Sequence, residues 1–442
     1  MSQAFPLILA QMVQLAYNIV DRIYIGHMPG ENASVALTGI GLCFPIITMI
    51  SAFVNLVSTG SAPLCSMARG KGEVKKAQDI LNNAYALQII ISISLIILIN
   101  LTKKPLLYVL GASDVTYGYA VSYLNIYIFG TMFFALGTGM NTFINLQGYP
   151  RMGMCTIVIG AVMNLILDPI FIFVMGMGVK GAATATIISQ FCSAAWVSQF
   201  LFSAKRELRL IPKEIGLKKY ILKDVLVLGI PGFIMGATNT AVQSVCNATL
   251  HMHGGDIYVG IMTIINSVRE IAGLPINGIT SGSQPVISYN YGARKYDRVK
   301  QGIRFTAFVA ISYTALFWVT TLTFPHMLLQ IFTDEARVVN TGLMPIRVYF
   351  MGFLFMSLQF CGQSSFVAMG KAKQAIFFSI FRKIIIVVPL TILLPMVHDL
   401  GVMGVFLAEP ISNFVGGNAS FWTMYFTVYK KLGKERKNDG TA

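Results

Sequence analysis

The chain is dominated by long stretches that contain no charged side chain. Several of them are longer than the roughly 18 to 20 apolar residues that cross the hydrocarbon core of a bilayer. They cover residues 32–68, 80–102, 115–150, 181–204, 225–253 and 305–333. Hydrophobic residues make up 55% of the 442 residues and charged residues only 12%, about half the charged fraction of a soluble domain. Because lipid offers no partner to an unpaired backbone amide, these segments must be helical. The sequence therefore predicts an all-α polytopic membrane protein.

Hydrophobic segments interrupted by one or two charges raise the expected total to about twelve transmembrane helices. Their approximate centres lie at residues 15, 47, 90, 130, 164, 192, 237, 268, 314, 353, 386 and 416. The first of these segments has no basic leader and ends in Asp21-Arg22 instead of a small-residue cleavage site. We therefore expect it to be a helix of the mature protein and not a secretory signal peptide.

An internal repeat divides the chain into two equivalent halves. The motif Gly60-Ser-Ala-Pro63, followed by Ser66 and Gly70, returns 222 residues later as Gly282-Ser-Gln-Pro285, followed by Ser288 and Gly292. A second motif, Gly178-Val179-x-Gly181, returns as Gly401-Val402-x-Gly404. Two sets of six helices have the same topology, so we expect a pseudo-symmetry axis along the membrane normal. The expected parts are an N-terminal lobe (1–204), a basic cytoplasmic linker (205–224), a C-terminal lobe (225–428) and a basic cytoplasmic tail (429–442).

Basic residues gather in alternate loops. One set of loops contains Arg69, Lys71, Lys75, Lys76, Arg151, the segments 205–223 and 294–304, Lys371, Lys373 and the segment 430–437. The opposite loops contain only Lys103, Lys104, Lys180 and Arg337. The positive-inside rule then predicts that both termini are cytoplasmic. Topology and anionic lipid headgroups account for the formal charge of +15, so no nucleic-acid partner is expected.

Several classes of function are disfavoured by what the sequence lacks. No GxxxxGK[ST] phosphate loop is present, so direct use of ATP by this chain is not expected. The six cysteines have no CxxC spacing and are expected to be small buried hydrophobic residues. The five histidines lack the HExxH spacing. We expect no enzymatic activity and no cofactor.

Polar residues within the expected spans are the candidates for function. Asn164 and Asp168, four residues apart, share one helix face. A carboxylate in a span normally faces the protein interior or a wet cavity, although Pro169 also permits a helix-end position. In the first span Gln14, Asn18 and Asp21 share a face, with Arg22 as a neutralising partner or a side chain that reaches outward.

The second half offers less defined candidates. Arg269 and Glu270 are adjacent on a helix and therefore point about 100° apart; a structural, a gating and a substrate-binding role all remain open. Glu409 and the pair Arg382-Lys383 could each form interhelical contacts. In the first half, Tyr123 and Tyr127 could stack on a flat ligand or simply pack against neighbours.

These motifs resemble those of the multidrug and toxic compound extrusion (MATE) transporters over essentially the whole chain. Gln14-x-x-Tyr17-Asn18-x-x-Asp21 is similar to their first-helix pattern, and Asn164-x-x-x-Asp168-Pro169 to their fifth helix. The resemblance is to the DinF-like or MepA-like bacterial branch. It implies a cation-coupling site of Asp21, Asn164 and Asp168, joined by Asn18, Thr186 and Tyr123, with Na⁺ as a possible ligand of the first three.

The sequence departs from the NorM-like branch of this family in the second half. Gln243 stands where that branch has an acid in the seventh helix, and Gln359 and Gln363 stand where it has one in the tenth. A NorM-type cation site is therefore not expected there. The candidates for the substrate cavity are Gln14, Tyr17, Gln243, Arg269, Glu270, Gln359 and Gln363.

The resemblance implies a multidrug efflux antiporter that exports organic cations or amphipathic compounds in exchange for H⁺ or Na⁺. It would act by alternating access, as a monomer in the cytoplasmic membrane of a bacterium. The alternative is a flippase of the same superfamily that moves a lipid-linked oligosaccharide or another amphiphile. The repeat does not extend to the carboxylates, because the counterpart of Asp168 is near Leu390 and that of Asp21 near Cys246. The expected coupling site therefore lies in the first half.

Overall fold

The computed structural model describes residues 4–26, 39–110, 112–204, 206–332, 335–397 and 400–432. A few side chains within helices also lie outside the described part, among them those of Asn18 and Asp21. The chain divides into two compact units, Met1–Gly236 and Ala237–Ala442, and the division falls inside helix α9.

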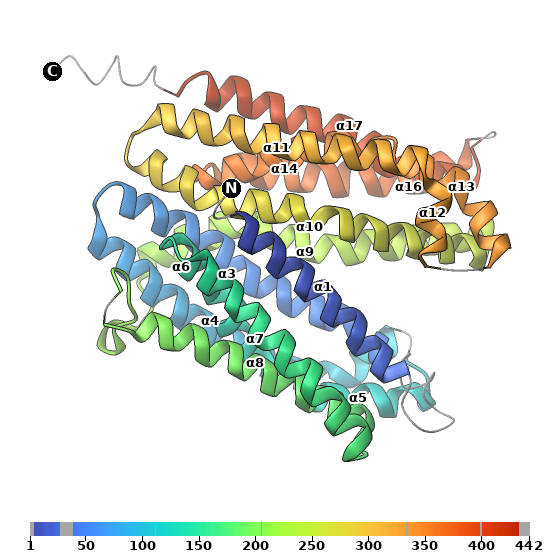
Figure 1. Ribbon diagram of the computed structural model, residues 1–442, viewed down its shortest axis with the longest axis horizontal. Helices are drawn as coiled ribbons and strands as arrows, with labels where there is room; N and C mark the ends of the chain where they lie inside the picture. Colours follow the sequence, from blue (N-terminus) through green and yellow to red (C-terminus); the bar gives the residue numbers. More distant parts are fainter. Residues whose placement is uncertain are drawn as a thin grey trace. The chain divides into compact units, whose positions relative to one another are not determined.

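The first unit is a bundle of long helices (Figure 1). Helix α5 (Asp114–Phe134) runs on through the π-helix η1 (Ala135–Gly139) into α6 (Met140–Leu146), and α7 (Pro150–Pro169) runs on into the π-helix η2 (Ile170–Val174). The other helices are α1 (Ala4–Gly26), α3 (Phe44–Gly70), α4 (Val74–Val109), α8 (Gly178–Phe202), the 3-10 turn η3 (Pro212–Glu214) and α9 (Lys219–Gly254), which enters the second unit.

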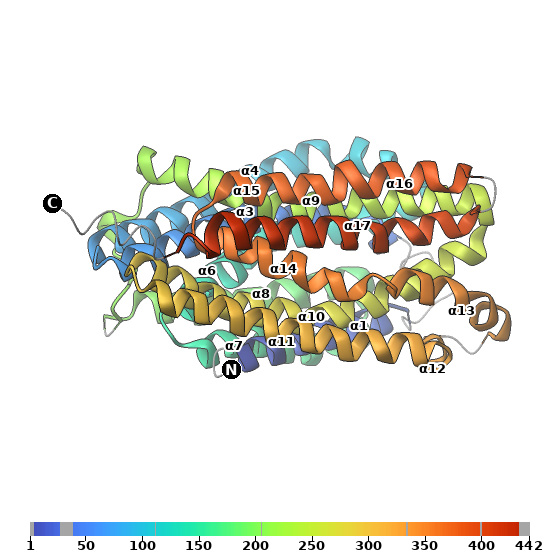
Figure 2. The same cartoon turned by 90° about the horizontal axis from the view of Figure 1, so that it is seen from above.

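The second unit continues from α9 with a similar succession of helices (Figure 2). Helix α15 (Ala372–Ile380) runs through the π-helix η4 (Phe381–Val387) into α16 (Val388–Leu393) and the 3-10 turn η5 (Leu394–Met396). The remaining elements are α10 (Asp256–Gly292), α11 (Tyr296–Thr323), α12 (Pro325–Gln330), α13 (Ala336–Phe350), α14 (Phe353–Ala368), α17 (Val402–Met424) and the π-helix η6 (Tyr425–Tyr429). Helix α14 packs against both α17 and α11.

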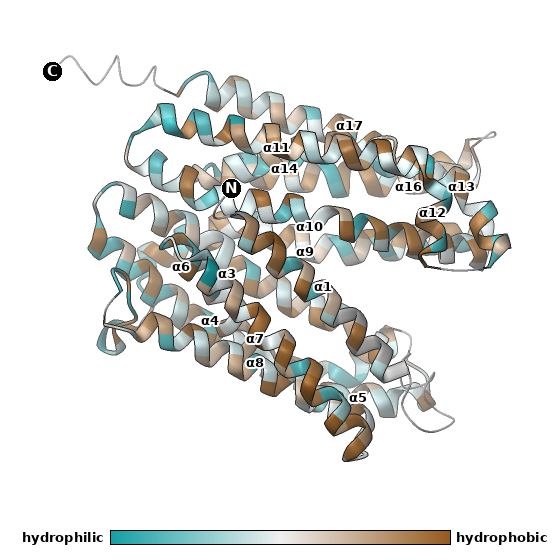
Figure 3. Cartoon of the chain, in the orientation of Figure 1, coloured by the Kyte–Doolittle hydropathy of each residue, from teal (hydrophilic) through white to brown (hydrophobic). Residues whose placement is uncertain are grey.

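The predicted all-α membrane fold is confirmed. Within the described residues, ten helices are long and apolar enough to cross a membrane. Helices α1 and α17, of 23 residues each, complete two sets of six, in agreement with the predicted total. Hydrophobic residues run along the helices of each unit, and hydrophilic residues gather towards the helix ends and loops (Figure 3).

The second repeated motif has the same backbone geometry in both units. Gly178 and Gly401, at the starts of α8 and α17, have positive φ angles of 54° and 46°, which favour glycine. Three residues later, a Cβ on Gly181 would lie 2.8 Å from the backbone of Phe171, and one on Gly404 would lie 2.5 Å from the backbone of Leu394. The motif thus fixes a turn and a close helix contact, which explains why both halves carry it.

The first repeated motif also includes a glycine at a close helix contact. A Cβ on Gly60 of α3 would lie 2.0 Å from the carbonyl oxygen of Val225, and one on Gly229 would lie 1.8 Å from that of Leu56. Only glycine therefore allows α3 and the first part of α9 to pack backbone to backbone.

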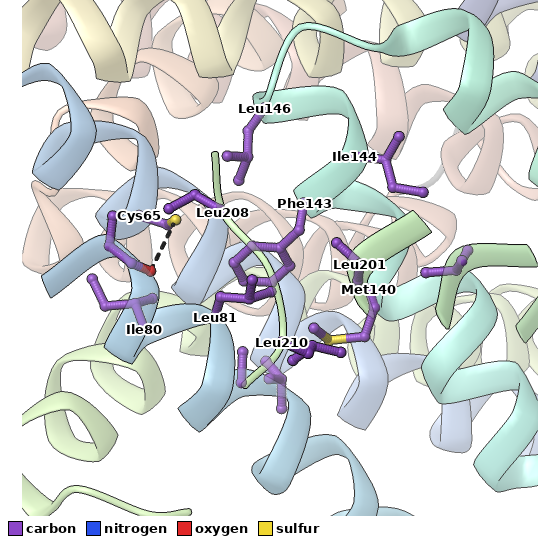
Figure 4. Packing of buried hydrophobic residues seen from close by; sticks show 14 of the residues in the cluster. Cys65, Ile80, Leu81, Met140, Phe143, Ile144, Leu146, Leu201, Leu208 and Leu210 are labelled. Atoms are coloured by element: carbon purple, nitrogen blue, oxygen red, sulfur yellow. Dashed lines mark hydrogen bonds between the residues drawn. The ribbon is translucent and has the colours of Figure 1, made fainter. Parts of the chain in front are cut away.

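Buried hydrophobic residues hold the linker segment after α8 against the first unit. Leu208 and Leu210 pack in one cluster with Leu81 and Phe143 (Figure 4). Polar contacts reinforce this packing, because the Asn82 side chain accepts a hydrogen bond from the Ile211 amide at 3.2 Å. Nearby, Lys218 lies 2.7 Å from Asp79, and this hydrogen bond raises the pKa of the lysine above its ordinary value.

Described residues of the predicted basic segments contact other helix ends or loops of their own unit. In the first, Arg69 pairs with Glu207 of the linker segment and donates to the carbonyl oxygen of Leu146 at 2.6 Å. In the second, the ammonium group of Lys300 lies 5.7 Å from the ring centre of Tyr429. All six cysteines are free thiols.

Candidate functional site

The first polar site is a buried amide and carboxylate on helix α7. Asn164 Nδ2 donates a hydrogen bond to Asp168 Oδ1 at 3.1 Å, so the two residues share a helix face as predicted. Asp168 is only 1% exposed and Asn164 only 3%. Directly after Pro169 the chain widens into the π-helix η2, a feature that often marks functional positions. A carboxylate so buried in a membrane-spanning helix is costly and points to a role in ion binding.

Helix α1, which carries Asn18 and Asp21, packs against α7 (Figure 1). The side chains of Asn18 and Asp21 lie outside the described residues, so their approach to Asp168 stays a prediction. Further along α1, Gln14 Nε2 donates to the hydroxyl of Tyr17 at 2.7 Å. These two candidates for the substrate cavity therefore contact each other.

The remaining candidates of the first unit lie on helices α5 and α8. Tyr123 is buried and stacks on Tyr127, with ring centres 5.5 Å apart. Thr186 is half-buried, and its hydroxyl donates to the carbonyl oxygen of Ala182 at 2.9 Å. Helix α8 packs against both α5 and α7. The structure thus places these residues on helices that adjoin the Asn164–Asp168 helix or its neighbour.

A polar cavity lies within the second unit. It encloses about 410 Å³ of empty volume, including the space at its mouth. Its walls come from α9, α10, α13, η4, α16 and α17. The polar side chains that line it include Gln243, Asn266, Arg269, Tyr349, Lys383 and Glu409.

A network of buried charges forms one wall of this cavity. Arg382 donates from Nη1 to Glu409 Oε1 at 3.0 Å and to Asn413 Oδ1 at 2.7 Å. Lys383 Nζ lies 3.7 Å from the same Glu409 oxygen. Both basic residues lie in the π-helix η4, whose wider turn brings neighbouring side chains nearer to one face. The network therefore joins η4 to α17 across the cavity wall.

The structure separates the candidates that the sequence had grouped in the second half. Gln243 and Arg269 line the cavity, whereas Glu270 is exposed and does not line it. Gln359 and Gln363 are buried outside the cavity lining. They form a hydrogen-bonded chain, with 3.2 Å from Gln359 Nε2 to Gln363 Oε1 and a further bond from Gln363 to Ser379.

Several residues of this cavity could not be singled out from the sequence. Asn266 and Tyr349 line the cavity, and they are isolated polar residues in two different spans. A single asparagine or tyrosine in a hydrophobic helix has no spacing signal, so only the tertiary fold brings these residues together. Arg382, Lys383 and Glu409 were recognisable in the sequence as intramembrane charges. The structure adds that Lys383 and Glu409 also line the cavity.

The membrane-spanning helices of the described residues, with polar side chains buried inside each half, have the repeated architecture that is common among secondary transporters. The MatE family model matches residues 6–170 and 231–393, one stretch in each half. The chain belongs to the MatE family of transporters and is not an enzyme, as the sequence predicted.

Related proteins match most of the chain. The multidrug export protein MepA of Staphylococcus saprophyticus is 23% identical over 86% of this chain and 84% of its own length. An FAD transporter of Shewanella oneidensis is 23% identical over 96% of this chain and 93% of its own length. A crystal structure of MATE in the bent conformation has a TM-score of 0.92 at 20% identity, covering 99% of this chain and 96% of that one. The last similarity shows a common fold.

Loss of the Glu409 carboxylate should destabilise the second unit. Glu409→Gln leaves Arg382 and Lys383 buried without their anionic partner, and breaking such a pair typically costs about 3–5 kcal/mol. We expect a clear fall in the melting temperature of the purified protein, measured by thermal unfolding in detergent. The matched control is Glu270→Gln, which changes an exposed carboxylate. Equal melting temperatures for the two variants would contradict the structural role of the network.

Proposed function

We propose that this protein is a secondary active efflux antiporter that exports organic cations or other amphipathic compounds in exchange for H⁺ or Na⁺. The observation that carries the proposal is the Asp168 carboxylate, buried in a membrane-spanning helix and hydrogen-bonded to Asn164. Membership of the MatE family and the similarity to multidrug export proteins named MepA support it.

In this mechanism the ion and the substrate favour different states of one alternating-access cycle. An H⁺ or Na⁺ that enters from outside binds the carboxylate of Asp168 and lowers the affinity for the substrate. Release of the ion to the inside restores the affinity for the next substrate. Such coupling requires only that each ligand binds the two states with different affinities. The amide oxygen of Asn164 and the carboxylate are both suitable for Na⁺, since hard cations take oxygen ligands.

The second unit supports the inclusion of Asp21 in this ion site. The repeat places the counterpart of Asp168 at Leu390 and that of Asp21 within one helical turn of Cys246. Cys246 Sγ lies 3.7 Å from the hydroxyl of Thr391, the residue after Leu390. Because the two halves repeat the same helix order, the first helix of the first half should approach its fifth helix in the same way. We therefore assign Asp21, Asn164 and Asp168 to one site.

Replacement of the buried carboxylate should abolish coupling. Asp168→Asn keeps the shape of the side chain but cannot release a proton or neutralise Na⁺. We expect gradient-driven efflux of a dye from proteoliposomes to fall to background, with an unchanged melting temperature.

The control for this variant is Asp224→Asn, an exposed acid of the same unit, which should transport normally. Gradients of H⁺ and Na⁺ imposed separately then identify the coupling ion. Normal efflux by folded Asp168→Asn would contradict the proposed site.

We further propose that the protein lies in the cytoplasmic membrane of a bacterium as a monomer, with both termini in the cytoplasm. The gathering of basic residues in alternate loops of the sequence supports this orientation. A membrane-impermeant maleimide should label Arg337→Cys in intact cells, but Lys213→Cys only after permeabilisation. Both positions are exposed, and the protein without an added cysteine gives the background. The reverse labelling pattern would refute the orientation.

A further inference from the structure

The cavity of the second unit has an excess of positive charge. Arg269 and Lys383 line it, and Arg382 lies behind Lys383 in the same network. Glu409 is the carboxylate that faces these three cations, and its Oε1 atom is already shared by Arg382 and Lys383. The Glu409 carboxylate therefore faces three basic side chains.

Arg269 is the cation that this carboxylate leaves without a salt bridge. Its Nε atom is buried and has no hydrogen-bond partner among the described residues. The neighbouring Glu270 also attracts Arg269, but its side chain is exposed and does not line the cavity. Arg269 thus presents a guanidinium group, the side chain best suited to bind a carboxylate or phosphate, at the wall of an accessible cavity.

Excess positive charge in the interior of a membrane-spanning unit favours the binding of an anionic group. Charged groups at this depth are costly unless they pair with a partner or face a wet cavity. The remaining walls include apolar side chains, among them Met262, Val387 and Val405, together with the ring of Tyr349. A ligand with an anionic group could pair with the cationic side chains, and an apolar or aromatic body attached to that group could pack against the apolar side chains.

We propose that this cavity binds the anionic group, a carboxylate, sulfonate or phosphate, of a water-soluble amphipathic substrate, and that Arg269 is its principal contact. This inference rests on the proposed export function and refines its substrate class from organic cations to amphiphiles that carry an anionic group. The substrate anion and the coupling cation then bind in different units of the chain, at sites of opposite charge.

The test compares two dyes with the same ring system. Fluorescein is anionic at neutral pH, whereas a rhodamine ester has the same xanthene ring and is cationic. Binding of each dye to the purified protein in phosphatidylcholine nanodiscs is measured by fluorescence anisotropy. Arg269→Gln should weaken fluorescein binding about tenfold or more, as expected for loss of a charge-assisted hydrogen bond, and should leave rhodamine binding unchanged or stronger.

Two further variants make the result specific. Arg337→Gln removes an exposed arginine of the same unit and should bind fluorescein as the native protein does. Arg269→Lys keeps the charge and should recover part of the affinity. Equal fluorescein affinities for the native protein and Arg269→Gln would overturn the proposal. An equal loss of affinity for fluorescein and for the rhodamine ester in Arg269→Gln would also overturn it.

A lipid headgroup is the other source of an anionic group, and a second set of nanodiscs tests it. If phosphatidylglycerol weakens fluorescein binding tenfold in the native protein but not in Arg269→Gln, the site takes a lipid headgroup and the proposed soluble substrate is wrong. Because these measurements need no ion gradient, they are separate from the efflux assay. If Arg269→Gln does not weaken fluorescein binding while the native protein still transports dye, only this inference is refuted. If Arg269→Gln weakens fluorescein binding but the native protein shows no gradient-driven efflux, the proposed antiport is refuted.

Discussion

The cost of a charged side chain inside a membrane-spanning bundle governs the polar architecture of this protein. A charge placed there needs a partner, a hydrogen bond or access to a wet cavity. Asp168 is 1% exposed and accepts a hydrogen bond from Asn164. Arg382 and Lys383 share the Glu409 carboxylate. In both units, therefore, the buried charges lie where they can be satisfied within the protein or by a ligand.

The two units place buried charges of opposite sign on corresponding helices. The fifth helix of the first half, α7, contains Asp168, whereas the fifth helix of the second half contains Arg382 and Lys383 in η4. A π-helical segment ends the first of these helices and interrupts the second. The duplication thus preserved the scaffold while the charges diverged. In our account the first half binds the coupling cation and the second half binds the substrate, so that one chain holds two ligands of opposite charge at separate sites.

The helices and their repeat could be predicted from the sequence more fully than the cavity of the second unit. Uncharged stretches predict the helices because a backbone that crosses lipid must form its hydrogen bonds internally. Gly178 and Gly401 mark equivalent turns because their backbone conformation favours glycine. Asn164 and Asp168 were predictable because helical spacing places them on one face. The cavity was not, since Asn266, Arg269, Tyr349, Lys383 and Glu409 come from four separate segments. Only tertiary packing decides which isolated polar residues of different helices face a common space.

The proposed antiport requires that binding of the substrate lowers the affinity of Asp168 for its ion. The direct measurement is the number of ions displaced when the purified protein binds dye, with H⁺ followed by a pH indicator and Na⁺ by a radioactive tracer. The native protein should release one of the two ions in proportion to the dye bound, and Asp168→Asn should bind dye without releasing either. Equal release from the two proteins, or dye binding to the native protein with no ion release, would contradict the account.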